Sequence, residues 1–167
     1  MSTAAAVAFQ TLAAPRHVAA GAGGLWWYGG QVAVKLTGAE TAGGVGMWVW
    51  DAHRGAASPV HDHSREDEYF LVVDGHARLF VGDGHIDAGP GDLAVLPRGV
   101  PHAYLIASET ARLVGMVCPG GFESFFTELG TPVVEGQPPA PAPEPALMAR
   151  TSAAYGVEIL GPPPTLD

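Results

Sequence analysis

Basic side chains are scarce in this sequence, which has one lysine and seven arginines among 167 residues and a formal net charge of −9. Proteins that bind nucleic acids or anionic membrane surfaces carry clustered lysine and arginine side chains that neutralise phosphates. The arginines here are spread along the chain. We therefore expect neither a nucleic acid nor a membrane as a partner.

Long apolar runs and cysteines are scarce as well. No run approaches the ~18 apolar residues that a membrane-spanning helix needs. The first residues also lack the basic start of a secretory leader. The single cysteine, Cys118, cannot form a disulfide within the chain. These features together predict a cytoplasmic protein.

Charged residues make up only 15% of the sequence, whereas apolar residues make up 47%. This balance is typical of a globular protein, and the length suffices for one domain with one core. Residues 25–130 are predicted to form that domain, after an N-terminal arm over 1–24. The remainder, 131–167, begins with a proline-rich linker and is expected to pack back on the domain.

Short β-strand patterns fill the predicted domain. Segments rich in β-branched and aromatic residues alternate with glycine, proline and Asp-Gly pairs. Strands this short, at intervals of about 8–12 residues, are typical of a sandwich or barrel. Asp74-Gly75 and Asp83-Gly84 are hairpin signals. The expected strands are 30–36, 45–53, 68–73, 76–82, 85–88, 93–97, 102–106 and 112–118.

Helical patterns occur only near the C-terminal end, so the predicted class is all-β with a few short C-terminal helices. An apolar stripe recurs at helical spacing, and Gly130 is placed to cap that helix. A second short helix is predicted over 146–156, followed by an extended piece from Val157. The stripe consists of Phe122, Phe125, Phe126 and Leu129.

The stretch PVHDHSREDEYF, starting at Pro59, concentrates the charge that the rest of the chain lacks. It is either a solvated turn or a place where several side chains share a metal ion. His61 and His63 are two residues apart, so on a strand both point to the same face. Glu66 falls in the following turn and is expected to be solvated, although it is the next candidate ligand if Glu68 is not one.

Glu68 begins a strand pattern that is apolar on both faces. Phe70 and Val72 share its face, and the opposite face is formed by Tyr69, Leu71 and Val73. We therefore expect both faces of this strand to be covered. Glu68 is then a buried carboxylate, which needs a cation or a proton to offset its desolvation.

A third histidine, His102, starts a later strand pattern behind Pro97 and Gly99. Three imidazoles and one carboxylate brought together in a barrel suit a first-row transition metal. An octahedral ion with these ligands keeps two positions open, where substrate or dioxygen binds.

The spacing of these residues resembles the two sequence motifs of the cupin superfamily. The first motif is matched by Gly55-x5-His61-x-His63-x4-Glu68-x6-Gly75 and the second by Gly91-x5-Pro97-x-Gly99-x2-His102. Only the last position differs, where Ile106 replaces a frequent asparagine. The resemblance implies a double-stranded β-helix, or jelly-roll barrel, with one divalent metal ion. Its ligands would be His61, His63, Glu68 and His102.

Stretches outside these motifs resemble quercetinase-like single-domain cupins. They are an aromatic patch followed by Thr37-Gly38 and Thr41-Ala42-Gly43, the stretch CPGGFESFFTELGTP, and the ending YGVEILGPP. This resemblance implies a flavonol 2,4-dioxygenase, which uses O2 to cleave the flavonol heterocycle and releases carbon monoxide. It also implies that Glu68 is both a ligand and the general base for the substrate hydroxyl. The metal is left open among iron, nickel, manganese, cobalt, copper and zinc.

Aromatic side chains are expected to line a pocket beside the metal. The pocket residues would be Trp48, Trp50, Phe70, Tyr104 and Ile106. Such walls suit a flat, small aromatic substrate with one chelating polar edge. An aromatic barrel core without a ligand gives the same pattern.

Two other functions stay open at this point. One is a different metal-cupin reaction, such as an isomerisation, a decarboxylation or another oxygenation, and the other is a non-catalytic ligand-binding cupin. A barrel of this size exposes strand edges that must be covered. We expect a homodimer that exchanges the strand Val7–Leu12, the alternative being that this segment is an unpaired terminus.

Overall fold

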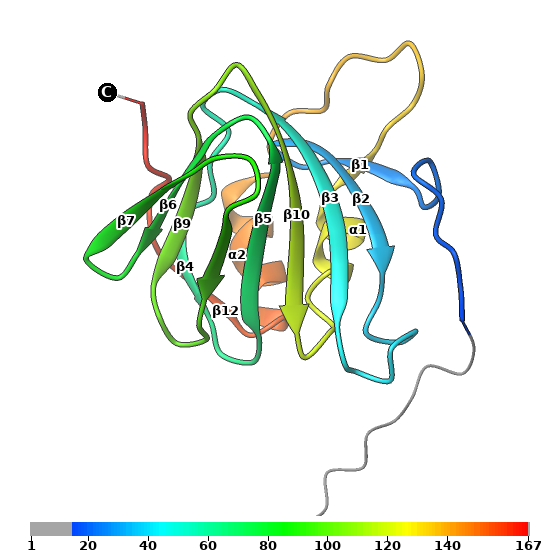
Figure 1. Cartoon of the computed structure of the whole chain (residues 1–167), viewed down its shortest axis with the longest axis horizontal. Helices are drawn as coiled ribbons and strands as arrows, with labels where there is room; N and C mark the ends of the chain where they lie inside the picture. Colours follow the sequence, from blue (N-terminus) through cyan, green and yellow to red (C-terminus); the bar gives the residue numbers. More distant parts are fainter. Residues whose placement is uncertain (1–14, 167) are drawn as a thin grey trace, which may run out of the picture.

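The computed structural model describes residues 15–166 and consists of two antiparallel sheets and two short helices (Figure 1). One sheet has seven strands in the order β11-β1-β2-β3-β10-β5-β8, and the other has five in the order β12-β4-β9-β6-β7. In Figure 1 the larger sheet lies in front of both helices. The prediction of an all-β domain with a few short C-terminal helices is confirmed.

The predicted strand segments agree with observed strands to within a few residues, whereas Leu25–Trp27, Val60–His63 and Thr131–Pro132 were not among them. The larger sheet contains β1 (Leu25–Trp27), β2 (Gly30–Leu36), β3 (Gly46–His53), β5 (Asp67–Asp74), β8 (Leu93–Leu96), β10 (Thr110–Cys118) and β11 (Thr131–Pro132). The smaller sheet contains β4 (Val60–His63), β6 (Ala77–Val81), β7 (Gly84–Ala88), β9 (His102–Ile106) and β12 (Val157–Gly161). The helices are α1 (Ser124–Leu129) and α2 (Pro145–Ala154), and neither is long and apolar enough to cross a membrane.

One of the two predicted hairpins is wrong. Strand β5 belongs to the larger sheet and β6 to the smaller one, so Asp74-Gly75 carries the chain between sheets. Gly75 has φ +77°, and a Cβ there would lie 2.2 Å from the Thr110 carbonyl oxygen. The local turn chemistry was correct, but an Asp-Gly pair does not specify which strands pair. The second hairpin is confirmed, since β6 pairs with β7, but its turn residues are Gly82 and Asp83, because Gly84 already begins β7.

Two tryptophans occupy the space between the sheets, each beside a glycine. A Cβ at Gly115 would lie 2.2 Å from Trp48 Cε2, and one at Gly30 would lie 2.7 Å from Trp50 Nε1. Both indole rings are almost fully buried. The two glycines have no side chain, and the indole rings fill the volume that a side chain would occupy there. Such filling is expected because a packed core leaves few voids.

Helix α1 is attached to the barrel by a buried carboxylate. Glu123 accepts hydrogen bonds from the backbone N–H groups of Gly38 at 2.6 Å and Gly121 at 2.7 Å. A Cβ at Gly46 would overlap this carboxyl group, so glycine is required there. The contact fixes the helix against the β2–β3 connection and turns the predicted phenylalanine stripe toward the core.

The C-terminal segment contributes a strand to the barrel. After the proline-rich linker, α2 leads into β12, which pairs with β4. The register places Val157 opposite His63 and Ile159 opposite His61. The segment therefore supports the strand that carries two candidate ligands. The predicted exchanged strand Val7–Leu12 lies outside the described residues.

The expectation that both faces of β5 are covered is wrong for residues 15–166. The inward face, with Glu68 and Phe70, is buried. On the outward face Tyr69 and Leu71 are only half-buried, and Val73 is 48% exposed. The larger sheet therefore has an apolar outer surface that no described segment covers.

We predict that Gly115→Ala lowers the free energy of unfolding by about 1–3 kcal/mol, because the added methyl group overpacks the Trp48 ring. Gly84→Ala is the matched control, since the nearest atom to its Cβ lies 3.9 Å away. Denaturant unfolding followed by tryptophan fluorescence measures both variants. Equal stability of the two variants would contradict the packing account.

Candidate metal centre

The four predicted ligands converge from both sheets of the barrel. His61 and His63 lie on β4, and His102 lies at the start of β9, where it pairs with His61 in the sheet register. Glu68 faces them from β5 in the opposite sheet. One potential ligand atom from each residue lies within 4.8 Å of the others, and all four residues are buried.

Each imidazole is oriented through its Nδ1 atom. His61 Nδ1 lies 2.8 Å from the Pro59 carbonyl oxygen, and His102 Nδ1 lies 2.8 Å from that of Val100. A carbonyl oxygen only accepts, so these contacts require Nδ1–H as donor and leave the lone pair on Nε2. That tautomer presents Nε2 as a metal ligand.

Three polar atoms of the cluster lack hydrogen-bond partners among the described residues. His63 Nε2, His102 Nε2 and one Glu68 oxygen are buried and unsatisfied. Glu68 Oε2 approaches His102 Nε2 to 3.2 Å without a well-aligned hydrogen bond. Unsatisfied buried groups are costly, and a cation among them satisfies all at once. The donor set thus fits a divalent transition metal ion.

Electrostatics favour a neutral ring at His61 and a carboxylate at Glu68. Burial, assisted by the neighbouring His102, lowers the pKa of His61 to about 4, so its ring is neutral and free to act as a ligand. Burial opposes ionisation of Glu68, yet the His102, His63 and His61 rings bring its pKa below the ordinary value. Glu68 is therefore a carboxylate, as a ligand must be. Burial lowers the pKa of His102, but the adjacent Glu68 outweighs burial and raises it, so a cation at His102 competes with a proton.

Glu66 corrects one expectation from the sequence. Instead of being solvated in the turn, its side chain is buried, and its Oε2 lies 3.4 Å from His63 Nδ1. It does not belong to the four-residue cluster. Its position is that of a carboxylate orienting a ligating histidine from behind, a recurrent arrangement in metal sites. The other histidines, His17, His53, His76 and His85, are exposed.

An aromatic cavity adjoins the candidate metal centre. Of the predicted pocket residues, Trp48, Trp50, Phe70 and Tyr104 line it together with His61 and Glu68. Ile106 does not line it. That residue is fully buried elsewhere in the core, because β9 has by then run away from the cavity. The cavity measures about 40 Å³, room for a few water molecules.

Sequence reasoning missed the walls that come from outside the two motifs. Tyr28 lines the cavity from just after β1, the phenylalanine stripe of α1 from one side, and Met148, Ser152 and Val157 from the C-terminal segment. The stripe itself was visible at helical spacing, but nothing in the sequence says which surface it covers.

Burial raises the pKa of Tyr28 and of Tyr104, and the Glu68 charge contributes to both, so both phenols stay protonated donors.

Comparisons with known proteins agree with this geometry. Residues 48–117 match the family described as Cupin domain. Quercetin 2,3-dioxygenase of Bacillus subtilis (strain 168) is 28% identical over 144 residues, which are 86% of this chain and 43% of that protein. Quercetin 2,3-dioxygenase of Aspergillus japonicus is 32% identical over 76 residues, covering 42% of this chain and 22% of that protein. The chain spans less than half the length of these curated relatives.

A solved structure with a similar fold is a variant of oxalate decarboxylase from Bacillus subtilis. It superposes with a TM-score of 0.52 at 26% identity and covers 60% of this chain and 28% of that one. The similarity therefore concerns the barrel rather than the whole of either protein.

We predict that Glu66→Gln weakens the affinity for a divalent metal about 10- to 100-fold, because the amide is a poorer acceptor for His63 Nδ1–H. Asp62→Asn is the control, since Asp62 is adjacent in sequence but alternates out of the cluster on β4. Competition between the protein and a chelator for Co²⁺ measures the affinity. Equal affinities in the two variants would show that Glu66 does not support the site.

Proposed function

Because residues 48–117 form a cupin domain in which four ionisable side chains converge, we propose that the chain is a metal-dependent dioxygenase that cleaves a flavonol-like, quercetin-type substrate with O2. The cupin resemblance and the barrel are confirmed by the family match and the fold. The observation that carries the proposal is the combination of buried, unpartnered ligand atoms with an aromatic cavity that shares His61 and Glu68.

The roles of the residues follow from their positions. His61, His63, Glu68 and His102 would hold the ion, which when bound acts as a Lewis acid toward a substrate hydroxyl and as a site for O2 chemistry. Glu68 lines the cavity as well as the cluster, so its carboxylate can accept the proton of that hydroxyl. The rings of Trp50 and Tyr104, tilted by 58° with centroids 4.7 Å apart, form part of an apolar wall against which a flat substrate would pack.

The curated relatives support this choice of substrate. Two are quercetin 2,3-dioxygenases, and the Bacillus subtilis relative matches over most of this chain. The matched part is less than half of that relative, so the activity of this chain requires its own measurement.

A second candidate function is favoured by the size of the cavity. A three-ring flavonol does not fit in about 40 Å³ unless side chains rotate or the segment of α2 and β12 moves aside. A metal-dependent reaction on a smaller enol or carboxylic acid needs no such movement. This reaction would be an isomerisation, a decarboxylation or a different oxygenation.

A panel experiment separates the two candidates. The full chain is loaded in turn with Mn²⁺, Fe²⁺, Co²⁺, Ni²⁺, Cu²⁺ or Zn²⁺, and the bound metal is quantified. Flavonol absorbance, O2 consumption and carbon monoxide release are then followed with flavonols and with small enolic substrates. Flavonol loss matched by O2 uptake supports the dioxygenase. Full metal occupancy without flavonol turnover rejects it, and turnover of a small substrate then favours the second candidate.

We predict that Glu68→Gln lowers kcat on the turned-over substrate about 10²- to 10⁴-fold, because the amide cannot take up the substrate proton. Three histidines remain to hold the ion, so bound metal is measured alongside activity. Glu135→Gln, in the exposed linker, is the matched control. Undiminished turnover in a metal-loaded Glu68→Gln protein would remove Glu68 from the mechanism.

A further inference from the structure

Two tyrosine hydroxyl groups belong to a cavity wall that is otherwise mostly apolar. Tyr28 and Tyr104 line the cavity together with tryptophan, phenylalanine and aliphatic side chains. Neither hydroxyl forms a hydrogen bond with a described residue, and both side chains are half-buried. A tyrosine hydroxyl inside a protein usually has a partner, because a buried polar group without one is costly. The two hydroxyls are therefore available to a bound molecule.

Aromatic contacts hold both tyrosine rings in place. The Tyr104 ring packs against Trp50 and Phe70, with centroid distances of 4.7 and 5.7 Å. The Tyr28 ring stands edge-on against two phenylalanines of α1 at 5.4 and 5.5 Å. The backbone N–H of Tyr28 also donates to the Gly30 carbonyl oxygen at 2.8 Å. Donors that are already held in place lose little conformational freedom when a ligand binds.

The tyrosines lie next to the candidate metal centre. Tyr104 follows His102 on β9 by two residues, so it points to the same face roughly 7 Å further along the strand. Phe70, which the Tyr104 ring contacts, follows Glu68 on β5 in the same way. Burial raises the pKa of both phenols, and the Glu68 charge is a further cause at Tyr28 and at Tyr104. Because such charge effects weaken with distance, the two phenols and the carboxylate border the same part of the cavity.

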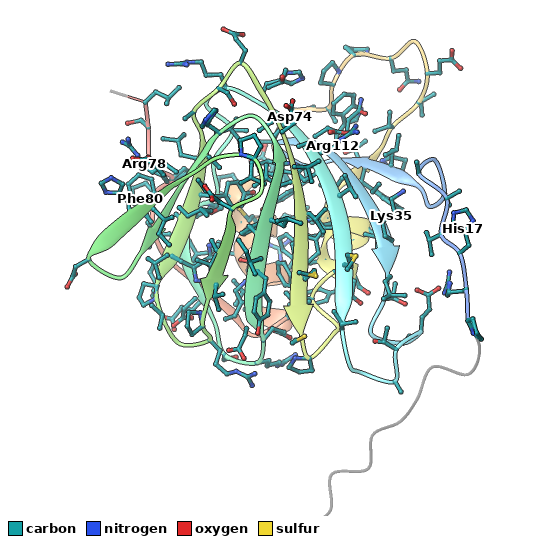
Figure 2. The ribbon with its side chains drawn as sticks, viewed as in Figure 1. His17, Lys35, Asp74, Arg78, Phe80 and Arg112 are labelled. Atoms are coloured by element: carbon teal, nitrogen blue, oxygen red, sulfur yellow. The ribbon has the colours of Figure 1, made fainter. Side chains whose placement is uncertain are left out.

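Positive side chains do not contribute to this wall. No lysine or arginine is among the described residues that line the cavity. Arg78 and Arg112, labelled in Figure 2, have exposed side chains. Lys35, also labelled there, donates to two backbone carbonyl oxygens at 2.6 and 2.7 Å. An anionic second group on a substrate would meet the Glu68 charge with no lysine or arginine to balance it. A neutral acceptor, such as a carbonyl oxygen, suits the two hydroxyls better.

Proton transfer to Glu68 gives two donors at this place a chemical role. When an enol with a carbonyl group on the neighbouring carbon loses its proton, negative charge spreads onto the carbonyl oxygen. That oxygen has two lone pairs and accepts two hydrogen bonds. Donors aimed at a position where charge develops stabilise the transition state. Both phenols have a raised pKa, so they keep their protons and remain donors while Glu68 accepts one.

We propose that Tyr28 and Tyr104 donate hydrogen bonds to a carbonyl oxygen adjacent to the reacting hydroxyl, so that the site selects enols with a carbonyl group on the neighbouring carbon. The assignment rests on the proposed function, in which Glu68 accepts the proton of the substrate hydroxyl. It narrows the substrate class, because flavonols and hydroxypyranones carry such a carbonyl group whereas simple phenols do not. It applies to either candidate reaction, provided that the substrate is an enol of this kind.

The test measures the binding of two small probes to the Co²⁺-loaded full chain in the absence of O2. Maltol is a ring enol with an adjacent carbonyl group, and phenol lacks that group. The bound Co²⁺ is quantified in each variant, and its visible absorption spectrum then reports binding of the probe. We expect Tyr28→Phe and Tyr104→Phe each to weaken maltol binding about 3- to 10-fold, as the loss of one hydrogen bond does, and to leave phenol binding unchanged. The double variant is expected to lose about 10- to 100-fold.

Tyr69→Phe is the matched control, because Tyr69 is adjacent to Glu68 on β5 but lies on its outward face. It is expected to bind both probes as the wild type does. The variants at Tyr28 and Tyr104 keep their rings and lose no hydrogen bond to a described residue. Their unfolding temperatures are therefore expected to equal that of the wild type, which separates a loss of recognition from a loss of structure.

Three results would overturn the assignment. Unchanged maltol affinity in both variants would place the carbonyl oxygen elsewhere, for example on the ion as a second chelating atom. Equal weakening for maltol and for phenol would mean that the hydroxyls act only through packing. A wild-type chain that binds Co²⁺ but no maltol would also reject it.

Failure of the proposed function gives a different result. The preference for maltol is measured without O2, so it persists even if the chain turns over no flavonol. A chain that binds no ion at the cluster loses the proposed function. Tyrosine variants with unaltered maltol binding and full turnover contradict only the role of Tyr28 and Tyr104.

Discussion

The structure depends on burying four ionisable side chains where they have too few partners of their own. His61, His63, His102 and Glu68 are removed from water between two sheets. The inward atoms of His63, His102 and Glu68 are left unsatisfied. This desolvation is costly in the isolated chain and is compensated when a cation binds. The backbone carbonyls of Pro59 and Val100, and the buried Glu66, turn the imidazoles so that their Nε2 atoms face the centre. The site depends on the whole fold, because the smaller sheet supplies the three histidines and the larger sheet supplies Glu68.

Successive side chains of a strand point to opposite faces of the sheet, so the two faces of the larger sheet have different surroundings. On β5, Glu68 and Phe70 point to the cavity, while Tyr69 and Leu71 point to the opposite surface. The same holds on β3, where Trp48 and Trp50 alternate with Met47 and Val49. The sequence of these strands is apolar at nearly every position, which a sheet with one solvated face does not require. The inner face carries the candidate metal centre and borders the aromatic cavity.

Period-2 alternation was sufficient for most of the strands, because it is a local signal. The barrel and the four converging residues followed from the resemblance to the two cupin motifs, whose fixed spacing is also read locally. Sequence reasoning failed where the outcome depends on contacts between distant segments. Asp74-Gly75 is a turn as expected, yet only the tertiary structure shows that it joins two sheets. Glu66 was expected in solvent because the turn that buries it against His63 leaves no periodic pattern. Ile106 was assigned to the cavity from its face alone, although β9 extends beyond the cavity before reaching it.

The most direct measurement is X-ray absorption and crystallography of the protein after loading with a divalent transition metal. The account predicts one ion per chain, bound by Nε2 of His61, His63 and His102 and by a Glu68 oxygen at about 2.0–2.2 Å, with room for further ligands toward the cavity. An empty cluster after loading with each candidate metal, or an ion held by other residues, would contradict it.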